Sequence, residues 1–134
     1  MKNTVYKICL IAVLITLSFG QSMAQGGQGV AITNASFKAP TPERENLNGE
    51  WVEITNHGME AQDMDGWTLS DQQNHVYKFM SFTLASNASV KVHSGTGADT
   101  ATDVFWNSNQ SIWNNDGDVA TLKDEAQNVI SVWP

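Results

Sequence analysis

Residues 50–56 read EWVEITN, and within them the aliphatic side chains of Val52 and Ile54 alternate with aromatic or polar ones. Successive residues of a strand point to opposite faces, so Val52 and Ile54 share one side and Trp51, Glu53 and Thr55 the other. One apolar face and one largely polar face are typical of a strand that covers a core on one side only. This stretch therefore predicts a half-buried β-strand.

Short apolar runs of the same kind follow at intervals of roughly ten residues, separated by turn-forming residues. Trp67 and Leu69 alternate with Thr68, which predicts that both face the core. No helical periodicity persists over about a dozen residues. The sequence predicts an all-β sandwich formed by one domain, residues 30–134. We expect its strands at residues 30–37, 50–55, 67–69, 76–79, 82–84, 90–93, 104–106, 120–122 and 130–132.

The first 24 residues have the composition of a signal peptide. Lys2 and Lys7 form a basic start, and residues 8–19 form an apolar stretch. That stretch is too short to favour the alternative, an uncleaved membrane anchor, which needs about 20 apolar residues. Residues 22–24, SMA, place small side chains at the expected cleavage site. We therefore predict cleavage after Ala24 and a secreted or periplasmic protein.

After that cleavage, residues 25–29 (QGGQG) form an expected flexible linker. The single cysteine, Cys9, leaves with the signal peptide, so the mature chain has no disulfide and no thiol nucleophile. The 134-residue chain has a net charge of −7, and the loss of Lys2 and Lys7 makes it −9. Such an acidic chain is a poor partner for nucleic acid, whose binding depends on phosphate neutralisation.

The ordered series of segments resembles the lamin-tail domain family. Residues 50–56 are similar to its strand of acidic, aromatic and Val-Glu-Ile residues, and residues 64–71 (MDGWTLSD) to its Gly-Trp motif. Matching segments continue at residues 77–84, at residues 103–106 (DVFW), and through Trp113 to residues 122–124 (LKD). The resemblance implies an immunoglobulin-like β-sandwich, a fold found at the end of nuclear lamins and in many secreted bacterial proteins.

Two turns depart from the family pattern. Asn87 and residues 127–128 (QN) stand where family members often carry glycine. Asparagine tolerates the left-handed backbone, so we expect both turns to survive. The family commonly serves as an accessory domain beside hydrolases, so the resemblance itself implies no catalytic activity for this chain.

The residues themselves also favour a protein that is not an enzyme. No Gly-x-Ser-x-Gly nucleophile motif is present, and a small hydrolase is the least favoured alternative. His57, His75 and His93 follow one another at intervals of eighteen residues, which suggests a metal site. They fall in different turns and strands and form no His-x-His or His-Glu-x-x-His pattern, so we expect solvated surface histidines and no cofactor.

Residues 114–118 (NNDGD) carry oxygen ligands suited to calcium, chiefly Asp116 and Asp118. Asp99 and Asp103 could add to such a site. The EF-hand spacing is missing, so a turn is the simpler interpretation. A calcium-dependent adhesion or matrix module is the second functional hypothesis.

Three tryptophans are the candidate contact residues, Trp51, Trp106 and Trp113. Trp51 falls on the side opposite Val52 and Ile54, and the other two flank a polar stretch, residues 107–111. Exposed tryptophan stacks on sugar rings or anchors a protein partner. The alternative is that each covers an open end of the sandwich. The leading hypothesis is an exported, non-catalytic interaction module that binds a protein or a cell-surface or extracellular polymer.

Overall fold

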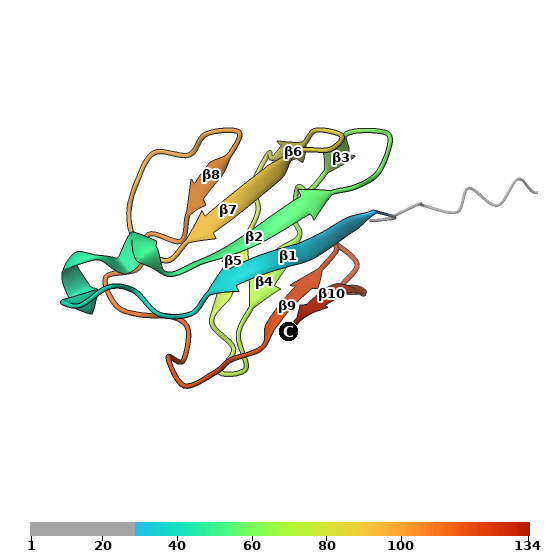
Figure 1. Cartoon of the computed structure of the whole chain (residues 1–134). Coiled ribbons are helices and arrows are strands. Elements are labelled where there is room, and N and C mark those ends of the chain that lie inside the picture. The colour runs from blue at the N-terminus through green and yellow to red at the C-terminus, as the bar shows by residue number, and fades with distance from the viewer. Residues whose placement is uncertain (1–28) are drawn as a thin grey trace, which may run out of the picture.

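The computed structural model describes residues 29–134 and shows a sandwich of two four-stranded sheets (Figure 1). The first sheet has the order β1-β2-β7-β8 and the second β10-β9-β4-β5. All neighbours are antiparallel except β7 and β8, which are parallel. The predicted all-β sandwich is confirmed. The predicted signal peptide, and all of the predicted linker except Gly29, lie outside the described residues.

The elements follow the predicted strands closely. They are β1 (Val30–Ser36), the 3-10 turns η1 (Glu43–Glu45) and η2 (Leu47–Gly49), β2 (Trp51–Asn56), β3 (Gln62–Asp63), β4 (Thr68–Ser70), β5 (Val76–Lys78), β6 (Thr83–Leu84), β7 (Ser89–His93), β8 (Asp103–Phe105), β9 (Ala120–Lys123) and β10 (Val129–Trp133). The short pair β3–β6 was not predicted, because two-residue strands show no alternation. Within residues 29–134, no helix has the length and apolar character needed to cross a membrane.

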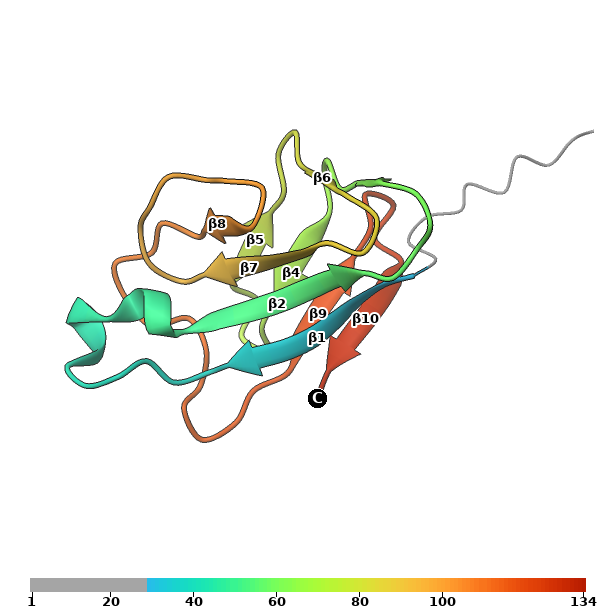
Figure 2. The ribbon, with the colours of Figure 1, turned by 45° about the horizontal axis from the view of Figure 1, so that its top comes forward.

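The core lies between the two sheets and takes the inward residues of both. Val52 and Ile54 of β2 are fully buried, and so are Trp67 and Leu69, as the alternation predicted. Burying an aliphatic or aromatic side chain of this size contributes about 1.5–3 kcal/mol to the free energy of folding. The order of the sheets places β1 beside β10 (Figure 2), so the sandwich is closed along that side.

Turns between strands are held by aspartate side chains. Asp124 follows β9, and its carboxylate accepts hydrogen bonds from the backbone N–H groups of Ala126 (3.0 Å) and Asn128 (2.8 Å). Asn87 has a φ of 59°, as expected for a position that favours glycine. In the last hairpin the left-handed residue is Gln127, with a φ of 67°, and not Asn128. Asn128 instead uses its side-chain amide to bind Asp124 Oδ2, at 2.9 Å.

Glu50 links three segments at the loop end of the sandwich, the end where η1 and η2 lie. This residue is fully buried directly before β2, and its Oε1 accepts three hydrogen bonds. The donors are Ser94 Oγ (2.6 Å), Ile112 N–H (2.7 Å) and Trp113 N–H (3.0 Å). The Glu50 carbonyl also accepts a bond from Ser94 N–H, at 3.0 Å. One side chain therefore joins the start of β2, the end of β7 and the segment that precedes β9.

We expect Glu50→Ala to lower the free energy of unfolding by about 3 kcal/mol or more, because it leaves three buried donors without an acceptor. Glu50→Gln keeps an acceptor oxygen of similar shape and should cost clearly less. Equilibrium unfolding in urea measures both variants against the wild-type chain. Equal losses in the two variants would show that the hydrogen bonds to Oε1 do not carry the stability.

Candidate functional site

The β1, β8 and β5 edges of the two sheets differ in how their backbone groups are satisfied. The β1 edge faces β10, and the Ile32 N–H donates to Ser131 Oγ at 3.0 Å. The β8 edge is closed by its own preceding loop. Asp103 N–H donates to Thr100 Oγ1 (3.1 Å), the Asp103 carbonyl accepts from Thr100 N–H (2.8 Å), and Phe105 N–H donates to Asp99 Oδ1 (3.0 Å). Such covering is a common protection against unwanted strand pairing.

The β5 edge is open. Phe79 N–H donates to the Trp67 carbonyl (2.9 Å), and the His75 carbonyl accepts from Asp71 N–H (3.3 Å), so these residues turn toward β4. Alternation along an antiparallel strand then turns the N–H and C=O groups of Val76 and Lys78 outward. Among residues 29–134, these outward groups have no hydrogen-bond partner. Val76 is also 53% exposed.

A cleft of about 380 Å³ separates the open β5 edge from β8. Its aromatic wall contains Tyr77 and Trp106, whose ring centroids lie 5.8 Å apart. Burial, with a smaller effect from the nearby Asp99 carboxylate, raises the pKa of Tyr77 to about 12. The phenol is therefore neutral in the cleft at physiological pH. The lining residues are Val76, Tyr77, Lys78, Met80, Phe82, Asp99, Val104, Phe105, Trp106 and Asn107.

Trp106 also belongs to a chain of touching aromatic rings that crosses the sandwich. It packs edge-on against Trp113 at 6.0 Å, and Trp113 stacks on Phe37 at 5.1 Å. On the other side Tyr77 meets Phe79 at 5.0 Å. Trp106 is half-buried, with one side on the core and the other on the cleft. Its position is fixed by these neighbours, so a partner would meet a preformed surface.

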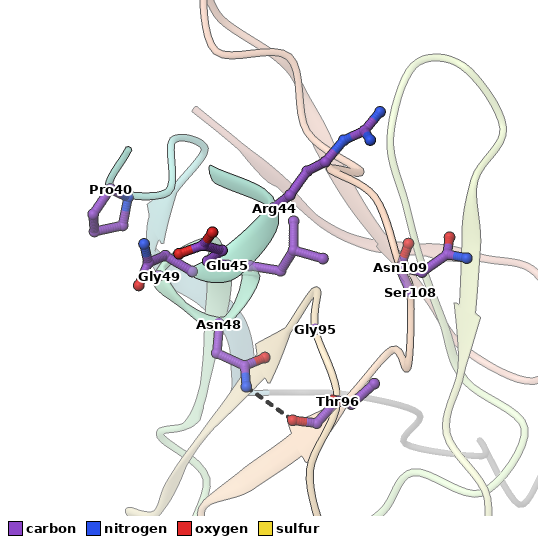
Figure 3. A pocket seen from close by; sticks show the side chains of 11 residues that line it. Pro40, Arg44, Glu45, Asn48, Gly49, Gly95, Thr96, Ser108 and Asn109 are labelled. Carbon is purple, nitrogen blue, oxygen red and sulfur yellow. Dashed lines mark hydrogen bonds between the residues drawn. The ribbon is translucent and has the colours of Figure 1, made fainter. Parts of the chain in front are cut away.

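A second pocket, of about 560 Å³, lies at the loop end of the sandwich (Figure 3). Residues of η1 and η2 form one side, and Ser108 and Asn109 lie across from them. The Asn48 side-chain amide donates to the Thr96 carbonyl at 2.9 Å. Gly95 leaves no room for a side chain, because a Cβ there would lie 2.4 Å from Asn48 Oδ1. The pocket offers side-chain amides, the hydroxyls of Thr96 and Ser108 and the charged side chains of Arg44 and Glu45, but no aromatic ring.

The three candidate tryptophans occupy different environments. Trp106 lines the cleft between β5 and β8. Trp51 lies on the outer face of β2, as predicted, but Lys91 Nζ sits 4.1 Å from the centre of its ring, so that ring face is occupied. Trp113 is only 3% exposed and packs in the core, which agrees with the alternative that this side chain covers part of the sandwich and not with a role as a contact residue. The Glu50 bond to its backbone holds it there.

Comparison with protein families gives a match to the Lamin Tail Domain over residues 22–133. The chain belongs to the lamin tail domain family. Domains of this family have an immunoglobulin-like fold, are non-enzymatic, and often act as protein-interaction modules. The predicted immunoglobulin-like β-sandwich is thereby confirmed. A search of curated proteins finds no match to the chain.

The three histidines of this lamin tail domain do not meet. His57 is exposed, as predicted. His75 and His93 are not freely solvated, because each binds an aspartate: His75 Nδ1 lies 2.6 Å from Asp71 Oδ2, and His93 Nε2 lies 2.7 Å from Asp103 Oδ1. The His93 side chain is 14% exposed, and its Nδ1 also donates to the Asn48 carbonyl at 2.9 Å. Both act as local crosslinks.

Three of the four carboxylates considered for calcium are bound within the fold: those of Asp99 and Asp118 accept backbone N–H bonds, and that of Asp103 binds the side chains of His93 and Thr102. Asp118 is buried, and its two oxygens accept hydrogen bonds from Val119 N–H (2.8 Å) and Asn114 N–H (2.9 Å). Asp116 is exposed in the same turn, whereas Asp99 lies in the loop before β8 and Asp103 is the first residue of β8. Within residues 29–134, no group of three or more acidic, histidine or cysteine side chains is arranged to hold a metal ion.

Sequence reasoning offered Trp106 as a candidate contact residue but did not find the sheet edge beside it. The signal is present in residues 76–80, VYKFM, where apolar side chains occupy both faces of the strand. Tyr77 and Phe79 point inward, so Val76 and Met80 must be exposed together with Lys78. Met80 is 73% exposed. An apolar residue on both faces of a strand in a half-buried sheet indicates either a covered edge or a binding edge.

The stability of this lamin tail domain should fall in acid through Asp103 and Asp124. Hydrogen bonds from His93 and then Thr102 lower the pKa of the Asp103 carboxyl, and bonds led by the Asn128 side chain lower that of Asp124. A lowered folded pKa stabilises the fold above the ordinary value of 3.8, and this contribution is lost as pH falls through the folded value. We expect a constant melting temperature between about pH 7 and pH 5, and a decline below about pH 4.

Thermal melting followed by circular dichroism across this pH range measures the effect. Asp103→Asn and Asp124→Asn should each make the acid decline shallower, because the titrating group is gone. Asp116→Asn, at an exposed position in a turn, is the matched control and should follow the wild-type curve. A wild-type curve that stays flat to pH 2 would contradict the assignment.

Proposed function

We propose that this lamin tail domain is an exported, non-catalytic interaction module that binds a protein or an extracellular polymer. The observation that carries the proposal is the cleft between β5 and β8, where half-buried Trp106 and Tyr77 lie beside an open sheet edge. Rigid aromatic side chains that are partly exposed are the usual anchors of binding surfaces. The family's frequent use in protein interaction supports the same function.

The chemistry of the cleft supports binding over catalysis. Its one carboxylate is Asp99, whose Oδ1 is already bonded to Phe105 N–H. Tyr77 holds its proton more tightly than an ordinary tyrosine, since its pKa is raised to about 12. A general base needs a pKa near the working pH and a free acceptor. These groups are suited to hydrogen bonding and packing, and a small hydrolase is not favoured.

Calcium-dependent adhesion gains no support from the described residues. The two aspartates on which it rested, Asp116 and Asp118, share a turn, but Asp118 directs both oxygens at backbone N–H groups. A cation at Asp118 would have to replace those bonds. Binding through the aromatic cleft requires no such rearrangement.

Export is the part of the proposal that rests on residues 1–24. We expect the protein expressed in a bacterial host to appear outside the cytoplasm, with an N-terminus that begins at Gln25. Cell fractionation followed by intact-mass measurement of the purified protein tests both statements. A substitution of Ala24 by a bulky residue should leave the leader attached, because small side chains are needed there. A full-length protein in the cytosol of the wild-type culture would refute export.

Binding is tested by cosedimentation of the purified protein with insoluble cell-wall and polysaccharide preparations and by crosslinking to secreted proteins of the native host. DNA-cellulose is the control for acidic polymers. We expect Trp106→Ala to weaken retention or crosslinking by about tenfold or more, as for a typical anchor residue. Trp51→Ala should have a smaller effect, because Lys91 already covers that ring.

Trp106→Ala also removes packing against Trp113 and Tyr77, so its melting temperature must be measured in parallel. A folded Trp106→Ala protein that binds every identified partner as the wild type does would exclude the cleft as the binding surface.

A further inference from the structure

We propose that the open edge of β5 binds an extended, acidic peptide strand that adds to the second sheet and places alternate side chains in the aromatic cleft. This inference rests on the proposed function as an interaction module and specifies the partner and the way it binds. Addition of a strand to a sheet edge is a general mode of peptide recognition, in which main-chain bonds give affinity and pockets for alternate side chains give specificity.

The first argument is the contrast between β5 and the equivalent strand of the other sheet. At β8, the Asp99–Thr100 loop satisfies three outward backbone groups of Asp103 and Phe105. At β5, the outward groups of Val76 and Lys78 remain available, which gives two donors and two acceptors in register for an added strand. A loop of the chain covers the backbone groups of β8, whereas those of β5 remain uncovered.

The second argument is the alternation of surroundings along that edge. Side chains of an added strand would point alternately to the inner and outer faces of the sheet. Those on the inner side would enter the cleft beside Tyr77 and Trp106, which suits an apolar or aromatic residue. Asp99 also lines this cleft, so an acidic side chain would be repelled there. The inner positions of the partner are therefore apolar.

The third argument is charge on the outer face. The strands β10, β9, β4 and β5 contain no acidic residue, although the chain as a whole has a net charge of −7. Lys78 and Lys123 lie on either side of Thr68 in one cross-strand row. Since neighbouring strands are about 4.8 Å apart, the two lysine backbones lie about 10 Å apart on the same face. A strand added to β5 would place its outward side chains next to Lys78, where carboxylates fit.

The acidity of the rest of the chain does not cancel this local preference. At physiological ionic strength, exposed charges separated by more than about 8 Å are largely screened. The charge preference of an added strand is therefore set by the nearest charge, that of Lys78. A second copy of the chain fits the edge less well. Two β5 strands in antiparallel pairing would bring Lys78 of both copies onto one sheet face, and each copy carries the same net negative charge.

Fluorescence anisotropy with labelled synthetic peptides tests the assignment on the purified protein. In the first peptide, glutamate alternates with valine or tyrosine. The second peptide has lysine in place of every glutamate. The third has the same composition as the first, but its residues are shuffled so that they do not alternate. We expect saturable binding of the first peptide only. Lys78→Glu should weaken it by about tenfold, as expected when an attractive contact becomes repulsive. Lys38→Glu makes the same charge change at an exposed loop position and should bind as the wild type does.

Two further changes test the backbone bonds themselves. Val76→Pro removes an outward N–H that the fold does not use, and proline is tolerated on edge strands, so the variant should keep its melting temperature and lose the peptide. N-methylation of alternate peptide amides needs no change in the protein. Methyl groups on the set that faces β5 should abolish binding, and those on the other set should not.

The outcomes separate this inference from the function on which it rests. Equal binding by the two methylated peptides, or wild-type binding by both Lys78→Glu and Val76→Pro, would overturn strand addition. Preference for the lysine peptide would overturn the acidic partner. A dimer that Val76→Pro converts to a monomer would assign the edge to a second copy. If Lys78→Glu and Val76→Pro bind as the wild type does but Trp106→Ala still reduces cosedimentation, the domain is an interaction module that does not use the β5 edge.

Discussion

A single buried carboxylate holds the loop end of this lamin tail domain in place. Glu50 precedes β2, and through its side-chain and backbone oxygens it binds Ser94 and the backbone of residues 112–113. These segments are far apart in the sequence, and hydrophobic burial alone would not fix their relative position, because it is non-directional. Trp113 is positioned by this bond, Trp106 packs on Trp113, and Tyr77 packs on Trp106. The geometry of the aromatic cleft thus depends on a buried contact of Glu50, a residue that does not itself line the cleft.

The acidic composition of the chain has a structural explanation in its turns. Asp71, Asp118 and Asp124 are all buried, and each accepts hydrogen bonds from backbone N–H groups of its own turn. Short strands leave many turns to stabilise, and a carboxylate that accepts backbone N–H bonds is a strong local acceptor. Acids that serve the backbone in this way are not available as ligands. The residue type that suggested calcium is therefore used mainly to build the fold.

Most of the fold could be predicted from sequence, because strand alternation is local information. Residues 50–56 and 67–69 show which side chains face the core, and the structure agrees. The candidate site was harder to predict from the sequence, since the exposure of an aromatic residue depends on contacts between segments that are distant in the chain. Nothing near Trp113 in sequence indicates the Glu50 bond that buries it, and nothing near Trp51 indicates Lys91 above its ring. The difference between the β5 and β8 edges is likewise a property of sheet order, which sequence periodicity does not contain.

That difference between the edges links stability to function. An unprotected edge invites aggregation, and proteins usually cover it, shorten it or charge it. In this domain β5 is only three residues long and carries Lys78, so it has two of these protections while its outward backbone groups stay free. A short, charged edge is too small to pair stably with an arbitrary strand. Selectivity then comes from the adjoining cleft, where Trp106 and Tyr77 add side-chain contacts that an indifferent strand would lack. The short length and the charge of β5 therefore limit aggregation when no partner is bound, and together with the cleft they favour binding of a selected strand.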